Sequence, residues 1–283
     1  MTRPIDVNAW IGGYPFRELP HPEPDILCRV LDREGFDGAW VGHLPGAWHR
    51  DVTPSNRALL AALAPHRDML QPALMVRPDW PGWERALRDA VSAGAPAIRV
   101  YPAQWGLAPG HSGLTELALA CGEQGVVLHV TVRFEDLRQR HPMDGVGDVP
   151  AATLRAIARA AGSACHLVVA GAARELIEET HWGLTVGEQA RVWYDFHWVW
   201  GPPEEHFAHL VRTLGPSRLT WSSWWPLRLT QQAGALVDLL PDDLQARVRA
   251  EPFVGGGEIR SSAQRAASLY IGNAKGTSAV SNR

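Results

Sequence analysis

The sequence predicts a single (β/α)8 barrel, the α/β fold in which eight parallel strands form a ring inside a layer of helices. Eight short apolar runs occur along the 283 residues, a segment with helical periodicity follows each of them, and no Pro/Gly/Ser-rich linker divides the chain. A barrel of this kind takes about 250 residues as one domain. The chain is therefore long enough to complete one.

The expected strands are the eight apolar runs. Their alternation with helical segments is typical of βα units repeated around a parallel sheet. They cover residues 5–10, 38–43, 70–76, 97–101, 126–131, 166–170, 192–196 and 219–222.

The expected helices lie between and after these runs, at 25–34, 55–63, 83–93, 114–123, 151–161, 174–179, 204–214 and 231–239. Proline or a capping residue stands near several of their starts, as in Thr53-Pro54-Ser55. Two further helical stretches, 242–249 and 261–270, predict a C-terminal helical extension over about 241–275. The small, polar residues 276–283 predict a flexible tail. The predicted domain is thus one barrel over residues 1–283.

The composition limits the classes of partner that the protein is expected to bind. The chain has 27 basic and 30 acidic residues and no basic block, so nucleic acid is not an expected partner. No stretch of about 18 apolar residues occurs, so we expect no membrane partner and a cytoplasmic protein. Three cysteines are too few for a disulfide framework or a Cys-based zinc site. Homo-oligomerisation is left open.

Four short segments, spread over nearly the whole chain, resemble a known family. Residues 5–12 (IDVNAWIG) look like a first strand in which Asp-x-His-x-His is usual, and residues 219–227 (LTWSSWWPL) are similar to a strand-eight motif Gly-Ser-Asp-Trp-Pro. Residues 127–129 (VLH) resemble a fifth strand, and residues 271–274 (IGNA) a Gly-Asn-Ala segment after the last helix. The family is the amidohydrolase-related (amidohydrolase 2) group of TIM barrels. The resemblance implies a metal-dependent-hydrolase-like fold and hydrolysis or a related carbon-bond cleavage.

Most of that family's metal-binding positions hold other residues here. Asn8 and Trp10 stand where the first-strand histidines are usual, Trp224 stands at the catalytic aspartate, and His129 is kept. A catalytic zinc needs about three protein ligands and an open water position, and an indole offers no ligand atom. The sequence therefore predicts no metal site and no cofactor. The alternative is one divalent metal such as zinc, held by Asp6, Asn8, His129 and Asp195.

The fifth expected strand carries the main catalytic candidates. In an extended strand His129, Thr131 and Arg133 share one face. If that face points into the open end of the barrel, here called the mouth, His129 is a general acid or base and Arg133 binds a carboxylate or phosphate. Glu135 would then orient either of them. The alternative is a solvated loop network over residues 133–140 that holds His141.

Two further strand ends add polar candidates. Arg99 and Tyr101 alternate with apolar residues in the fourth strand, and an arginine inside a parallel sheet needs a partner or a ligand. Asp195 and His197 share a face at the end of the seventh strand, and a carboxylate beside an imidazole raises its basicity. A structural salt bridge and a satisfied rim hydrogen bond are the respective alternatives.

Tryptophan is unusually frequent, with 13 residues, and several stand at expected strand ends, which predicts an aromatic-walled mouth. The predicted function is a barrel hydrolase or lyase that acts on a small anionic or flat organic molecule, with His129 as general acid/base. The alternative is a non-catalytic, ligand-binding pseudoenzyme of the same fold. The predicted catalytic residues are His129, Glu135, Asp195 and His197, and the predicted substrate-binding residues are Asn8, Trp10, Arg99, Tyr101, Arg133 and Trp224.

Overall fold

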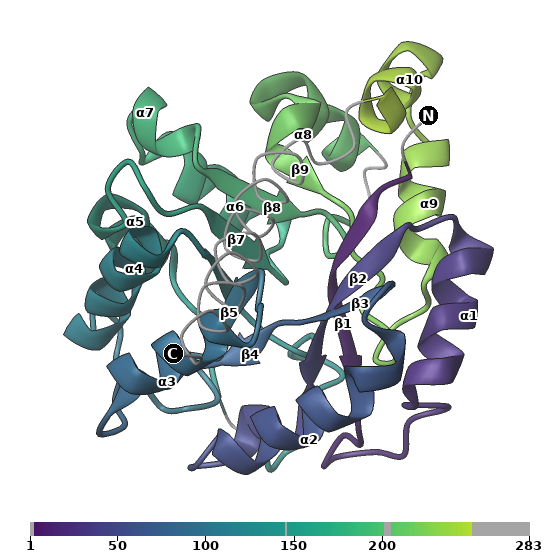
Figure 1. Cartoon of the computed structure of the whole chain (residues 1–283). Helices are drawn as coiled ribbons and strands as arrows, with labels where there is room; N and C mark the ends of the chain where they lie inside the picture. Colours follow the sequence, from purple (N-terminus) through teal and green to yellow (C-terminus); the bar gives the residue numbers. More distant parts are fainter. Residues whose placement is uncertain (1–2, 145, 201–204, 251–283) are drawn as a thin grey trace, which may run out of the picture.

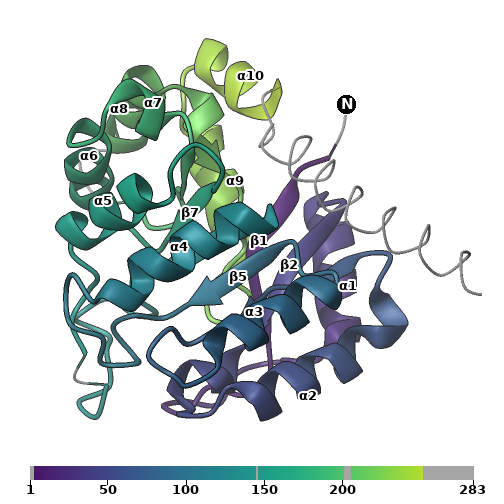
Figure 2. The same ribbon diagram turned by 60° about the vertical axis from the view of Figure 1, so that its left-hand side comes forward.

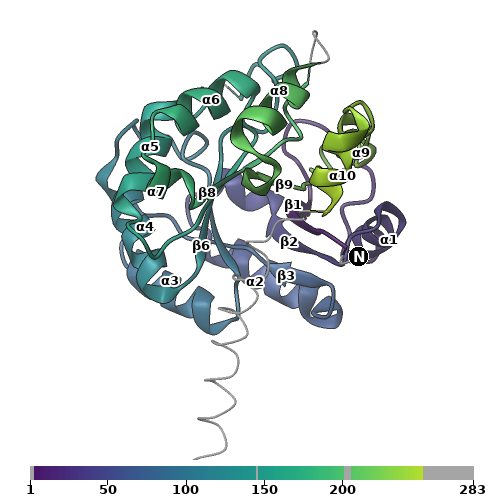
Figure 3. The ribbon, with the colours of Figure 1, turned by 90° about the horizontal axis from the view of Figure 1, so that it is seen from above.

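The strands follow one another in chain order and are all parallel, with the helices outside them (Figures 1 and 3). The computed structural model describes residues 3–144, 146–200 and 205–250. Its strands are β1 (Ile5–Ile11), β2 (Gly38–His43), β3 (Leu70–Pro72), β4 (Leu74–Met75), β5 (Ala97–Val100), β6 (Val127–Thr131), β7 (Leu167–Ala170), β8 (Val192–Asp195) and β9 (Leu219–Thr220).

Backbone hydrogen bonds join these strands into a ring. The ladders run β1-β2-β3 and β4-β5-β6-β7-β8-β9. The amide of Ala73, between β3 and β4, donates to the carbonyl of Val41 in β2 at 2.8 Å, so β3 and β4 are two parts of one strand. On the other side, the segment after β9 pairs with β1. The three bonds there are Val7 N to Trp221 O (3.1 Å), Trp224 N to Asn8 O (3.2 Å) and Trp10 N to Trp225 O (2.8 Å).

The helices that cover the ring are α1 (Pro24–Glu34), α2 (Thr53–Leu63), α3 (Trp83–Ser92), α4 (Ser112–Gln124), α5 (Ala151–Ala160), α6 (Arg174–Trp182), α7 (Val186–Gln189), α8 (Glu205–Leu214), α9 (Gln231–Asp238) and α10 (Asp242–Ala250). Helices α3, α4 and α5 pack side by side along the outside (Figure 2). Short 3-10 turns add Leu44–Trp48, Ala64–His66 and Pro216–Arg218.

Local sequence explains where a typical helix begins and ends. Helix α1 starts at Pro24, whose missing N–H costs nothing in the first turn, and stops at Gly35, which adopts a left-handed φ of 78°. Leu27, Val30 and Leu31 recur at helical spacing and are buried. The helix therefore presents one apolar stripe to the strands.

The floor of the barrel is an apolar layer formed near the starts of the strands. Side chains alternate along a barrel strand, so every second residue points inward. The inward cluster consists of Val7, Trp40, Ala73, Ala97, Val127, Val168 and Trp193. A larger apolar cluster combines the buried faces of the surrounding helices with the aromatic residues Trp10, Tyr101 and Trp224.

The predicted barrel is confirmed, and most predicted elements agree to within one to three residues. Three differences are local. The run 70–76 is interrupted at Ala73, the last strand covers two residues instead of four, and the short helix α7 had not been expected. A capping box between Thr185 and Glu188 starts α7.

The expected C-terminal extension is described only in part. Helix α10 begins it, whereas the expected helix 261–270 and the tail lie outside the described residues.

Within the described ranges, none of the helices has the length and apolar character needed to cross a membrane. Cys121 and Cys165 are buried free thiols, and Cys28 is half-buried.

Candidate functional site

A polar layer lies inside the barrel directly above its apolar floor. Arg99, His129 and Asp195 come two residues after floor residues in β5, β6 and β8, so the alternation of the strands points them inward as well. All three have no solvent exposure. Charged and titratable groups therefore occupy the middle of the barrel.

Asp195 accepts hydrogen bonds on both carboxylate oxygens. The Gly171 amide donates to Oδ1 at 3.0 Å. Oδ2 accepts from Trp224 Nε1 (2.5 Å), Ser222 Oγ (3.0 Å) and Asn8 Nδ2 (3.5 Å). Burial raises the pKa of Asp195 to about 6 in spite of these donors. The carboxyl group can therefore exchange a proton near neutral pH.

Arg99 is a buried cation without a close ion pair among the described residues. It donates to Asn8 Oδ1 at 2.7 Å and stacks on Trp10, with 4.9 Å from Cζ to the ring centroid. Burial lowers the pKa of Arg99, while Tyr101 and, to a smaller extent, the negative charges of Asp6 and Asp195 act to raise it. Since Arg99 and these carboxylates do not touch, their attraction is long-range.

His129 and its neighbours leave several buried polar atoms unpaired. Neither ring nitrogen of His129 has a partner at full hydrogen-bond geometry within the described residues. Burial lowers the His129 pKa well below the usual 6.5, and the nearby Val7 backbone acts against that shift. The imidazole is therefore neutral at pH 7. Other unpaired atoms are Asp6 Oδ2, Arg99 Nε and Thr131 Oγ1. Burial also raises the pKa of Asp6.

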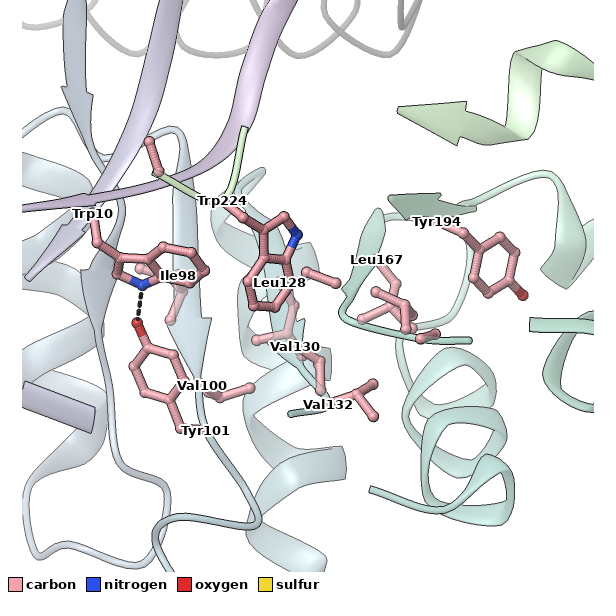
Figure 4. Close-up of a cluster of buried hydrophobic side chains, with 14 of the residues drawn as sticks. Trp10, Ile98, Val100, Tyr101, Leu128, Val130, Val132, Leu167, Tyr194 and Trp224 are labelled. Atoms are coloured by element: carbon pink, nitrogen blue, oxygen red, sulfur yellow. Dashed lines mark hydrogen bonds between the residues drawn. The ribbon is translucent and has the colours of Figure 1, made fainter. Parts of the chain in front are cut away.

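Trp10, Tyr101 and Trp224 form an aromatic layer among the buried apolar side chains of the barrel (Figure 4). The rings of Trp10 and Trp224 lie 5.0 Å apart, and Trp10 Nε1 donates to the Tyr101 hydroxyl at 3.0 Å. Phe134 covers both Trp10 (5.7 Å) and Tyr101 (5.2 Å). Trp10, Tyr101 and Trp224 are fully buried. The tryptophans expected in an aromatic-walled mouth include Trp10 and Trp224, which pack against each other as buried residues.

Two glycines make room for the tryptophans. A Cβ on Gly42, in β2, would come within 2.9 Å of Trp10. A Cβ on Gly171, after β7, would come within 3.0 Å of Trp224, and its φ of +86° disfavours other residues. The close fit of both indoles thus depends on missing side chains elsewhere in the ring.

Two predicted site residues, Arg133 and Glu135, lie at the rim and not in the polar layer. Arg133 pairs with Asp148 at 2.7 Å, and Glu135 pairs with Arg17 (3.3 Å) and Arg228 (3.0 Å). The side chains diverge from His129 because β6 ends at residue 131. These partners lie outside the solvated loop network considered as the alternative, and the Glu135 side chain is only 7% exposed.

The expected pairing of Asp195 with His197 does not occur, which corrects that interpretation. His197 Nδ1 lies 3.2 Å from the Ser222 carbonyl, while Asp195 is occupied by other donors. Burial lowers the pKa of His197 to about 3, so its ring is neutral. Asp195 and His197 thus stand at alternate positions of the chain but are not hydrogen-bonded to each other.

The structure adds residues that sequence reasoning missed. Ser222 and Gly171 bind Asp195, and Gly42 seats Trp10. Ser222 lies two residues before Trp224 in the same segment, so strand alternation could have indicated it. Arg17 and Arg228 lie in loops without periodicity and carried no signal.

The fold is shared with several solved structures. A TIM-barrel protein from Bordetella bronchiseptica matches with a TM-score of 0.63 and 11% identity over 93% of this chain and 99% of that one. The dihydroxybenzoic acid decarboxylase of Polaromonas sp. JS666 matches at 0.60 and 12% over 91% and 98%. A 2,6-dihydroxybenzoate decarboxylase in complex with 2,6-dihydroxybenzoate matches at 0.59 and 11% over 95% and 99%. No family model and no curated protein matches the sequence.

The expectation of no cofactor is wrong for this fold, because the Polaromonas decarboxylase binds manganese. In the described part of this chain, however, no three His, Cys, Asp or Glu side chains are grouped so that they could hold a metal ion. The indole of Trp224 occupies Asp195 Oδ2, and the guanidinium of Arg99 lies within electrostatic range of Asp6, Asp195 and His129. The arrangement described here does not fit such a metal.

The similarity to these structures covers nearly the full length of each chain, while identity stays between 8% and 13%. An amidohydrolase-like protein from Staphylococcus aureus matches at a TM-score of 0.63. The chain has the fold of the amidohydrolase-like TIM barrels.

Proposed function

We propose that this chain is an amidohydrolase-fold enzyme that acts on a small carboxylic acid, aromatic or unsaturated, as a lyase or hydrolase. The proposal rests mainly on the polar atoms inside the barrel that lack hydrogen-bond partners among the described residues: Asp6 Oδ2, Arg99 Nε, both ring nitrogens of His129 and Thr131 Oγ1. Unpaired buried polar groups destabilise a fold, typically by about 1–3 kcal/mol each. A polar guest would satisfy them.

The charges of this layer favour an acid as that guest. Arg99 lacks a contacting carboxylate within the described residues and is the natural partner for one. Asp195, with a pKa raised to about 6, can donate a proton near neutral pH. Neutral His129 offers one hydrogen-bond donor and one acceptor to the bound acid. Acids of this class are bound in a solved structure of the same fold, which holds 2,6-dihydroxybenzoate.

Entry requires the aromatic layer to part. Trp224 must leave Asp195 before a substrate can meet that carboxylate, since its indole N–H now occupies Oδ2. Trp224 adopts a left-handed φ of 56°, which is unfavourable for a residue with a large side chain and lowers the cost of rearranging it.

The closed layer also favours a second candidate, a binding protein without catalysis. Trp10, Tyr101 and Trp224 are fully buried; Trp10 is hydrogen-bonded to Tyr101, and Trp224 to Asp195 in the polar layer. Buried, hydrogen-bonded side chains above the polar layer suit a protein that holds a ligand without converting it. The two candidates differ in product formation alone.

The test is a panel of small aromatic and unsaturated carboxylic acids, screened by thermal shift and then assayed for product with and without manganese. We expect at least one acid to raise Tm and to be converted by the wild type. Asp195→Asn should retain binding and lose conversion, whereas the exposed control Asp243→Asn should retain both. Binding without conversion in every condition supports the second candidate. No binding at all contradicts both.

A further inference from the structure

One rim carboxylate is held by two arginines that come from opposite ends of the chain. Arg17 follows β1 and contacts Glu135 Oε1 at 3.3 Å, and Arg228 follows β9 and contacts Oε2 at 3.0 Å. The Glu135 side chain is only 7% exposed. Each oxygen of one planar carboxylate thus receives one guanidinium, an arrangement that suits a carboxylate in particular.

Contacts other than Glu135 keep both guanidinium groups in place. Arg17 donates to the Leu227 carbonyl at 2.7 Å and lies over the ring of Tyr14. Arg228 stacks on Trp198, with 4.3 Å from Cζ to the ring centroid. Arg228 also donates to Gln139 Oε1 at 2.9 Å, a bond to the loop that carries Glu135. The other three contacts are independent of that loop, so they hold the two arginines, here called the rim clamp, in place for an anion.

The two arginines need a negative charge between them. Burial lowers the pKa of Arg228, the Glu135 carboxylate acts to raise it, and the positive charge of Arg17 lowers it further. Without an anion, two neighbouring cations would repel each other in a partly buried setting.

We propose that Arg17 and Arg228 form a carboxylate-binding site at the rim, which Glu135 fills in the unliganded protein and from which an incoming carboxylic acid displaces it. This assignment rests on the proposed function for the class of ligand. Glu135 adjoins Phe134, which covers Trp10 and Tyr101. Displacing Glu135 would therefore loosen the residue that covers the aromatic layer.

The test measures binding of benzoate by calorimetry at low salt. Glu135→Gln removes the charge of the internal competitor, so we expect it to bind benzoate about tenfold more tightly than the wild type. Adding Arg228→Met to Glu135→Gln should abolish that gain. The exposed control Glu84→Gln should bind as the wild type does. Inorganic phosphate, titrated separately, should gain much less than benzoate from Glu135→Gln.

Equal benzoate affinity of Glu135→Gln and the wild type would overturn the assignment, and an equal gain for phosphate would overturn its carboxylate specificity. If Glu135→Gln does not fold, Arg17→Met in the wild-type background decides, because it must weaken benzoate binding at least several-fold. Calorimetry measures benzoate binding and does not require the protein to convert an acid. If Glu135→Gln gains tenfold in benzoate affinity but the protein converts no acid, only the enzymatic proposal is refuted.

Discussion

Replacing Asp195 by Asn tests whether burial or hydrogen bonding dominates at the centre of the barrel. Burial raises the pKa of Asp195 from 3.8 to about 6. A raised pKa means that the folded state holds the proton to a higher pH than the unfolded chain does. The carboxyl group therefore loses stabilisation as pH rises from about 4 to 6, and full ionisation costs the fold roughly 3 kcal/mol, at 1.36 kcal/mol per pH unit.

The experiment is urea unfolding of the wild type and Asp195→Asn at pH 4.5 and pH 7.5, followed by circular dichroism. Titration of all other groups is common to both proteins, so the difference between their unfolding free energies isolates residue 195. We expect the wild type to lose about 2 kcal/mol relative to the variant between these pH values. The loss of hydrogen bonds in the variant shifts both differences equally and leaves the pH trend intact.

The reasoning fails if that difference is independent of pH or changes in the opposite direction. The wild type could instead become more stable relative to Asp195→Asn as pH rises. That result would mean that the four hydrogen-bond donors outweigh burial and that the folded-state pKa of Asp195 lies below 3.8. Asp243→Asn, which removes an exposed carboxylate, serves as the control and should show no comparable trend.

Three further predictions concern the same layers. Gly42→Ala should lower the free energy of unfolding by about 1–3 kcal/mol, because its Cβ would come within 2.9 Å of Trp10, whereas Gly234→Ala, with nothing within 4 Å, should be neutral or slightly stabilising in the same urea assay. Arg99→Met should destabilise by roughly 3 kcal/mol, since it leaves buried carboxylates without a cation; an increase in Tm would contradict this. The His129 ring of the folded protein should remain neutral when pH falls through 6.5. The free energy of unfolding should then decrease over this pH range, because only the unfolded chain takes up the proton. An NMR titration in which the His129 ring of the folded protein is protonated near pH 6.5 would contradict this prediction.

The strands and helices could be predicted because each depends on a local pattern. The alternation along β5, β6 and β8 was also sufficient to place Arg99, His129 and Asp195 on inward faces. Their assignment to a common layer needs only strand period and parallel register. Their roles remain predictions.

The closed mouth could not be read from local pattern. Trp10 and Trp224 stand at strand ends, where solvent is near, yet they are buried because Gly42 and Gly171 leave space in other strands. That fit joins residues more than 30 positions apart. The rim clamp is similar, since Arg17 and Arg228 lie in loops that only the closed ring brings together.

The bonds between β1 and the segment 221–225 have a consequence for synthesis of the chain. The first strand can pair with β2 as soon as about 40 residues have emerged, but its other edge waits for a partner more than 200 residues later. Contacts of such high sequence separation slow folding and leave a strand edge open to wrong partners in the meantime. The nascent protein is therefore an incomplete sheet until residues 221–225 have emerged, and its ring can close only after that point.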